Sequence, residues 1–88
     1  MEKSGFIYIL TNKNNKVLYT GVTSNLEQRL HQHRTGFFND SFTSRYKVDK
    51  LVYYEEFPDI TDAIAREKQI KSGSRKKKTD LIERINPT

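Results

Sequence analysis

Three short stretches of the chain have the composition of β-strands. Residues 6–10 and 17–22 are rich in β-branched and aromatic side chains, and the polar segment 11–16 between them has the Asn and Lys residues typical of a turn. A third stretch of this kind, residues 50–57, ends at Pro58. The pattern therefore predicts a β-hairpin and a third strand that together form one small antiparallel or mixed sheet.

Three further segments, residues 24–34, 59–71 and 74–85, have the apolar spacing of amphipathic helices. Ser24 and Glu27 form a capping box at the first helix, and Asp59 and Ser74 are expected to cap the other two. The sequence thus predicts an α+β fold, with a three-stranded, mainly antiparallel sheet and about three helices. All 88 residues are expected to form a single domain with its core over about residues 5–87.

Each strand of the predicted hairpin carries a tyrosine, Tyr8 in the first and Tyr19 in the second, and Gly21 follows closely. Pairing of the strands would bring the two rings into one neighbourhood, and Gly21 would leave room there for a ligand or another backbone. Judged by spacing alone, ordinary strand aromatics are the simpler interpretation.

The first predicted helix places polar groups beside its apolar face. His33 shares that face with the leucines at positions 26 and 30, and Arg29 lies at its edge. A histidine in such a place is more often a core residue than a catalytic one. Arg29 cannot lose its charge, so it must either reach solvent or find an acceptor.

Glu67 is the strongest local conflict in the sequence. We expect Ile60, Ala63, Ile64 and Ile70 to form the buried stripe of the second helix, and Glu67 falls in the middle of that stripe. A buried carboxylate is costly unless it is paired, hydrogen-bonded or bound to a metal. The two interpretations are an ion pair with Arg29 and a metal ligand.

The net charge of +5 is concentrated near the end of the sequence. Residues 66–84 contain eight Lys or Arg residues and three acids, whereas the remainder has eight of each. A local basic surface favours a polyanionic partner, with nucleic acid before an acidic membrane surface. The candidate nucleic-acid-binding residues are Arg45, Lys47, Lys71, Arg75, Lys76, Lys77 and Lys78.

Two of those candidates belong to a long connection, residues 35–49, in which aromatic residues alternate with Arg45 and Lys47. Connections of this length are often binding loops, and the composition is typical of a surface that meets phosphates and bases. The chain has no cysteine, no apolar run long enough to cross a bilayer and no signal-peptide pattern at its start. These features lead us to expect a cytoplasmic protein that does not enter a membrane.

The ordered set of motifs resembles the GIY-YIG endonuclease family. Phe6-Ile7-Tyr8 stands for the first motif of that family and Tyr19-Thr20-Gly21 for the second, followed by Arg29 with His33 and by Glu67. The resemblance extends from Gly5 to Pro87 and is closest to the small single-domain branch. It implies a three-stranded sheet flanked by helices and a phosphodiesterase that uses one metal ion.

In such a site the resemblance implies that Glu67 holds one Mg²⁺ or Mn²⁺ and that Arg29 contacts the scissile phosphate. Tyr8 would accept the proton of the attacking water, and Tyr19 would position water or phosphate. A free tyrosine ionises near pKa 10, so this role needs positive charge nearby. His33 is the alternative proton acceptor.

The leading hypothesis is therefore a metal-dependent DNA endonuclease that serves repair or recombination. Nucleases of this family usually carry a separate DNA-binding domain, and this sequence shows none, so an unidentified protein partner is expected to contribute substrate specificity. The alternatives are a nucleic-acid-binding module that has lost catalysis and, less favoured by the localised charge, a protein–protein adaptor.

Overall fold

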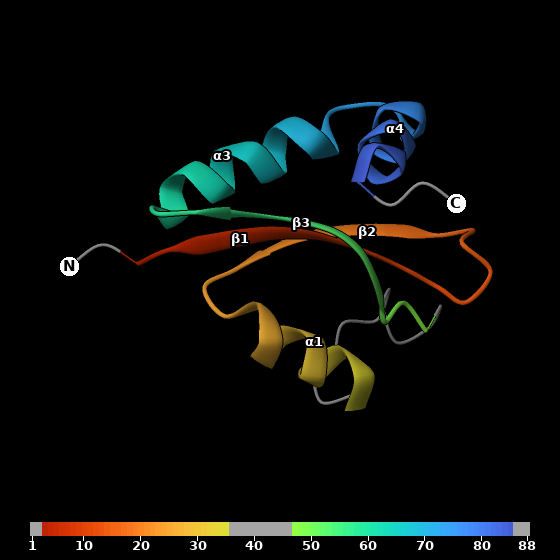
Figure 1. Cartoon of the computed structure of the whole chain (residues 1–88), viewed down its shortest axis with the longest axis horizontal. Coiled ribbons are helices and arrows are strands. Elements are labelled where there is room, and N and C mark those ends of the chain that lie inside the picture. The colour runs from red at the N-terminus through yellow and green to blue at the C-terminus, as the bar shows by residue number, and fades with distance from the viewer. Residues whose placement is uncertain (1–2, 36–46, 86–88) are drawn as a thin grey trace.

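The computed structural model describes residues 3–35 and 47–85 and contains all the predicted strands and helices. Figure 1 shows them in chain order, and the expected α+β fold is confirmed. The elements are β1 (Gly5–Thr11), β2 (Leu18–Thr23), α1 (Leu26–Thr35), β3 (Lys50–Phe57), α3 (Ile60–Lys71) and α4 (Arg75–Ile85).

The three strands form one antiparallel sheet in the order β2-β1-β3. In the central strand β1, Tyr8 faces Gly21 of β2 on one side and Tyr54 of β3 on the other. A register shift between Ile9 and Leu10 marks a bulge in the pairing with β3. In the strand order β2-β1-β3, β2 and β3 are the two edges of the sheet.

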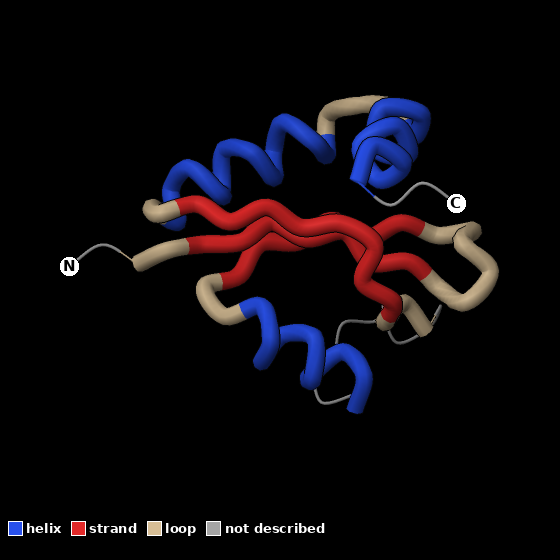
Figure 2. Tube along the Cα trace, in the orientation of Figure 1, coloured by secondary structure: helices blue, strands red, loops and turns tan. Residues whose placement is uncertain are grey.

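Helices cover both faces of the sheet, with α1 on one face and α3 and α4 on the other (Figures 1 and 2). Successive strand residues point to opposite faces, so β1 supplies both cores. Ile7 and Ile9 pack with Ala63 and Ile70 of α3, whereas Tyr8 and its neighbour Leu10 form the core that α1 covers.

Two of the three predicted helix caps are confirmed. The carboxylate of Asp59 accepts a hydrogen bond from the Thr61 backbone amide at 2.9 Å, and this bond lowers the pKa of Asp59. The Ser74 hydroxyl accepts from the Lys77 amide at 3.3 Å.

The capping box at Ser24 is wrong by one residue. Helix α1 begins at Leu26, and the side chain of Asn25 accepts a hydrogen bond from the Gln28 amide at 3.0 Å. The Thr23 hydroxyl accepts from the Asn25 amide at 3.1 Å and so holds Asn25 in the capping position.

The buried stripe predicted for α3 is only partly correct. Ala63 is fully buried and Ile70 is 5% exposed, but Ile64 is 37% exposed. Residue 64 follows Ala63 by one position, which turns its side chain about 100° away from the sheet. Glu67 and Arg66 take the flanking positions on either side of the line from Ala63 to Ile70.

Candidate active site

Tyr8, Tyr19 and His33 form an aromatic cluster between the sheet and α1. The ring centroids of the two tyrosines are 6.3 Å apart, so the pairing predicted from the hairpin is observed. The His33 ring stands edge-on to both, with centroid distances of 6.0 Å to Tyr8 and 5.7 Å to Tyr19. Helix α1 therefore adds a titratable group to the two phenols.

Gly21 makes this cluster possible, although not in the predicted way. The space above it is filled by the Tyr8 ring rather than left open for a ligand. A Cβ atom at position 21 would lie 2.5 Å from both Cζ and the hydroxyl oxygen of Tyr8. The glycine is needed because the tyrosine opposite crosses directly over it.

The Tyr8 hydroxyl and His33 Nε2 are 3.4 Å apart and form a hydrogen bond. With Nε2 unprotonated, the phenol donates to the imidazole, and the phenol oxygen keeps lone pairs that can accept a proton. Tyr8 is fully buried, so its ring has one orientation available. Along this hydrogen bond a proton can move from the phenol to the imidazole.

Arg29 comes from the same helix as His33, one turn earlier, and its side chain is partly buried. Helix α1 packs through Leu26 and Leu30 against the core that contains Tyr8. Four of the five predicted catalytic residues, Tyr8, Tyr19, Arg29 and His33, are thus carried by β1, β2 and α1 on one side of the sheet.

The fifth predicted residue, Glu67, comes from the opposite face. Its side chain is only 14% exposed, and its carboxylate pairs with the Lys71 ammonium at 2.8 Å. The alternative prediction of an ion pair with Arg29 is wrong, since the partner comes from α3 itself. Adjacent helix residues lie about 100° apart around the helix axis, so Glu67 leaves α3 in a different direction from Arg66, which reaches Glu55 of β3.

Glu67 is the only carboxylate among the predicted catalytic residues, so a metal ion bound there would have few protein ligands. Within residues 3–35 and 47–85, no group of three or more His, Cys, Asp or Glu residues could hold a metal ion. Mg²⁺ needs fewer protein ligands, because it keeps several waters and often binds through one carboxylate and substrate phosphates. The Thr20 hydroxyl, on the sheet face that α3 covers, is buried and lacks a hydrogen-bond partner among the described residues. One carboxylate such as Glu67 therefore fits a hard cation whose other ligands are water and substrate phosphate.

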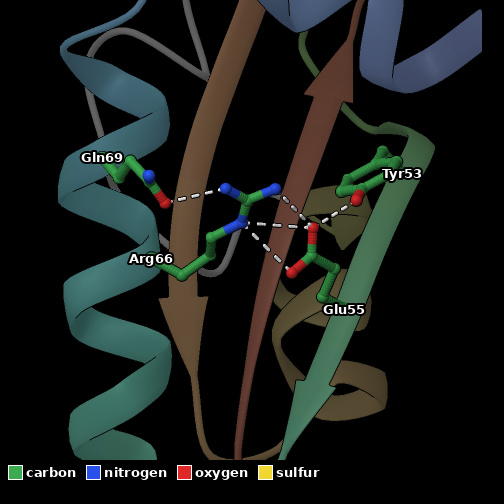
Figure 3. Close-up of polar contacts among 4 residues, drawn as sticks. All are labelled: Tyr53, Glu55, Arg66 and Gln69. Atoms are coloured by element: carbon green, nitrogen blue, oxygen red, sulfur yellow. Dashed lines mark hydrogen bonds and ion pairs between the residues drawn. The ribbon is translucent and has the colours of Figure 1, made fainter.

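A polar network that was not predicted from the sequence connects β3 and α3 (Figure 3). Arg66 donates to both carboxylate oxygens of Glu55 at 3.1–3.3 Å and to the Gln69 side-chain oxygen at 2.8 Å, while the Tyr53 hydroxyl also donates to Glu55. The signal was present in the alternation that places Tyr53 and Glu55 on one strand face.

The charges in this network shift the ionisation of its members. Burial raises the pKa of Tyr53 above its ordinary value, and the hydrogen bond to the Glu55 carboxylate raises it further. The same carboxylate raises the pKa of the Arg66 guanidinium. With side chains 27% and 23% exposed, Arg66 and Glu55 form a half-buried clamp between helix and sheet.

The predicted nucleic-acid-binding residues lie in different places. Lys47 is exposed with a positive φ of 52°, and Arg45 lies outside the described residues, as do the predicted loop aromatics at positions 37, 38, 42 and 46. Arg75 donates to the Asn15 backbone oxygen at 3.2 Å, which ties α4 to the hairpin turn. The remaining members lie at the end of α3 and the start of α4: Lys71, Lys76, Lys77 and Lys78.

Among the helices that the structure describes, none combines the length and apolar character that a membrane crossing requires.

Comparison with known proteins identifies the family to which the chain belongs. The GIY-YIG catalytic domain matches residues 4–80. The chain is 39% identical over 82 residues to a UPF0213 protein of Syntrophus aciditrophicus, covering 93% of this chain and 92% of that protein. It is 42% identical over 77 residues to a UPF0213 protein of Clostridium perfringens, covering 88% and 81%.

A solved structure has the same fold. The solution NMR structure of a UPF0213 protein from Bacillus halodurans matches with a TM-score of 0.60 and 28% identity, covering 96% of this chain and 87% of that one. The matched domain spans both tyrosine motifs, helix α1 and Glu67. The chain therefore belongs to the GIY-YIG family of nucleases.

Proposed function

We propose that the chain is a divalent-metal-dependent endonuclease that hydrolyses phosphodiester bonds of DNA, in repair or recombination. The observation that carries this proposal is the cluster of Tyr8, Tyr19 and His33, because it supplies a route for the proton of an attacking water in a chain of nuclease ancestry. Phosphodiester hydrolysis requires that proton transfer together with neutralisation of charge on the phosphate.

In the proposed reaction, a water held beside Tyr8 attacks the phosphorus atom, the P–O bond to one sugar oxygen breaks, and that leaving oxygen takes a proton from solvent. The water proton passes to the Tyr8 oxygen as the Tyr8 proton moves to His33 Nε2, along the hydrogen bond already present. Tyr19 orients the water or a phosphate oxygen, and Arg29 binds the phosphate through its planar guanidinium. Glu67 would hold one Mg²⁺ or Mn²⁺, which supplies positive charge for the phosphate oxygens.

The division of these residues between two sheet faces is consistent with this proposal because β2 is an edge strand. Tyr19 packs on the side of β2 that α1 covers, whereas Glu67 belongs to α3 on the other side of the sheet. A phosphate bound at that open edge can be approached from both faces. We therefore place the proposed cleavage site along the edge of β2.

The decisive experiment compares wild type with Glu67→Gln on labelled single-stranded, duplex, flap and four-way-junction DNA in Mn²⁺ at low salt. We expect metal-dependent nicking by wild type and none by a folded Glu67→Gln protein. Asp62→Asn is the matched control, because Asp62 is an exposed carboxylate on the same helix.

Other results would change the assignment. A folded wild-type protein that binds these DNAs in Mn²⁺ without cutting them would be a nucleic-acid-binding module with the nuclease fold. Loss of the folded circular dichroism spectrum in Glu67→Gln would show that the pair with Lys71 is structural.

A second prediction concerns the proton route. Tyr8→Phe keeps the buried ring but removes the hydroxyl that contacts His33, so we expect kcat to fall by about 10²–10⁴-fold with little change in substrate affinity. Single-turnover cleavage and oligonucleotide binding measure the two quantities separately. Unchanged cleavage by Tyr8→Phe would contradict the proposed route and leave His33 as a direct acceptor.

A further inference from the structure

A pocket of about 400 Å³ lies where the end of α3 meets the start of α4. Its walls come from both helices and from the turn at Ser72 and Gly73. In Figure 1, α3 runs across the view and α4 is seen end-on beside it, on the sheet face opposite to α1. The pocket is therefore separate from the cluster of Tyr8, Tyr19 and His33.

The rim of the pocket is cationic. Lys77, Lys78 and Arg84 line it together with a single acid, Asp80. The charge of Arg66, which also lines it, is already matched by Glu55. In the part of the chain that the structure describes, no ion pair forms between a carboxylate and any of the three rim cations. These like charges repel one another, and an anion in the pocket would remove that cost.

Other residues that line the pocket fit a nucleotide. The Gln69 side-chain oxygen accepts from Arg66, which leaves the two N–H bonds of the amide to donate to another acceptor. Ile70 and Leu81 supply an apolar floor. Cations at the rim, an amide donor and an apolar floor match a phosphate with its adjoining sugar.

We propose that this pocket binds one backbone phosphate, with its sugar, of a single-stranded nucleic-acid segment; the assignment rests on the proposed function. The pocket and the tyrosine cluster lie on opposite faces of a molecule that measures 39 × 30 × 21 Å. Duplex DNA stays nearly straight over about 500 Å and does not wrap around so small a body. A single strand turns easily, so a flap or another single-stranded arm can occupy both places.

The test measures binding of a fluorescently labelled single-stranded 12-mer in EDTA, where no cleavage interferes. Lys77→Gln/Arg84→Gln is compared with Lys3→Gln/Lys13→Gln, which removes the same charge from exposed positions outside the pocket. We expect Kd to rise at least tenfold in the pocket variant, with the salt slope reduced by about 1.4 for two lost contacts. The control should change Kd by less than threefold.

NMR with the wild-type chain locates the site independently. Titration with the 12-mer should shift the Gln69 side-chain amide resonances saturably, and inorganic phosphate should shift them more weakly. Equal losses in the two double variants, or unmoved Gln69 resonances when the 12-mer binds, would overturn the pocket assignment. Phosphate binding that the 12-mer does not displace would reassign the pocket to small anions. Neither the binding assay nor the NMR titration requires cleavage. Both can therefore be interpreted even if the nuclease assay shows no activity.

Discussion

Gly21 is the residue on which the geometry of the tyrosine pair most directly depends. The ring opposite lies so close to its backbone that any side chain would displace it. Tyr8 has no room to retreat, since it is fully buried in the core beneath α1. One hydrogen atom in place of a methyl group thus maintains the contact between Tyr8 and His33.

Gly21→Ala should therefore affect both stability and the proposed activity. A Cβ atom 2.5 Å from the Tyr8 ring forces it off its position, so we expect a loss of about 1–3 kcal/mol in unfolding free energy. The Tyr8–His33 hydrogen bond should break, and cleavage should fall with it. Urea unfolding and single-turnover assays measure the two effects.

Gly73→Ala is the matched control for that change. A Cβ atom there would lie 3.4 Å from its nearest neighbours, the Ile70 carbonyl oxygen and the Lys77 side chain, which the structure can accommodate. We expect unfolding free energy within about 1 kcal/mol of wild type. Equal destabilisation by both alanines would contradict the role given to the Tyr8–Gly21 contact.

Ionisation of Tyr53 should lower the folding stability of the protein at alkaline pH. Burial and Glu55 raise the pKa of Tyr53 in the folded state, so folding favours the protonated phenol. The stability that this phenol contributes is fully present below the unfolded pKa near 10. It is lost as pH rises through the folded pKa. We expect the melting temperature of wild type to fall more steeply above pH 10 than that of Tyr53→Phe. Parallel curves for the two proteins would show that ionisation of Tyr53 does not cause this loss.

At the scale of elements, the sequence predicted strands and helices where local signals mark them. Strand β3 and helix α3 were placed correctly because Pro58 ends one and Asp59 caps the other. The cap of α1 was misplaced because Ser24 and Asn25 are adjacent residues with similar capping preference. A local hydrogen bond distinguishes them, because the Thr23 hydroxyl, two residues before Asn25, accepts from the Asn25 amide.

The candidate site was harder to predict, because its residues come from elements far apart in the chain. The hairpin alone brought Tyr8 and Tyr19 together, since pairing of neighbouring strands fixes their register. Which sheet face α3 covers is not encoded in its own periodicity, so the sequence could not exclude a pair between Glu67 and Arg29. The alternation along β3 puts Glu55 and Tyr53 on one strand face, but it does not identify Arg66 as their partner, because Arg66 lies on another element.

The clamp between Arg66 and Glu55 should stabilise the contact between α3 and β3. Arg66→Ala leaves a half-buried carboxylate without its partner, so we expect a loss of about 1–2 kcal/mol in unfolding free energy. Lys68→Ala, at an exposed position of the same helix, should stay within about 0.5 kcal/mol. A double-mutant cycle with Glu55→Gln measures the coupling, and a coupling near zero would show that the clamp contributes no stability.

At the scale of the whole molecule, charge is distributed so that the excess of five falls within residues 66–84. These residues include the second half of α3 and nearly all of α4, on one side of the sheet. Nucleic-acid binding that relies on about six phosphate contacts should lose roughly 10³-fold in affinity between 50 and 200 mM salt. Fluorescence anisotropy over that range checks the estimate, and a shallow slope would indicate contacts that are not chiefly ionic.

The position of β1 between two cores has a consequence for saturation mutagenesis. The five residues from Ile7 to Thr11 are each 1% exposed or less, and Tyr8 is one of them. A library selected only for soluble expression would reject almost every polar replacement along this strand and would mark Tyr8 as indispensable for reasons unrelated to chemistry. Phenylalanine is the replacement at that position that separates folding from chemistry, because it should pass a selection for folding and fail a selection for cleavage.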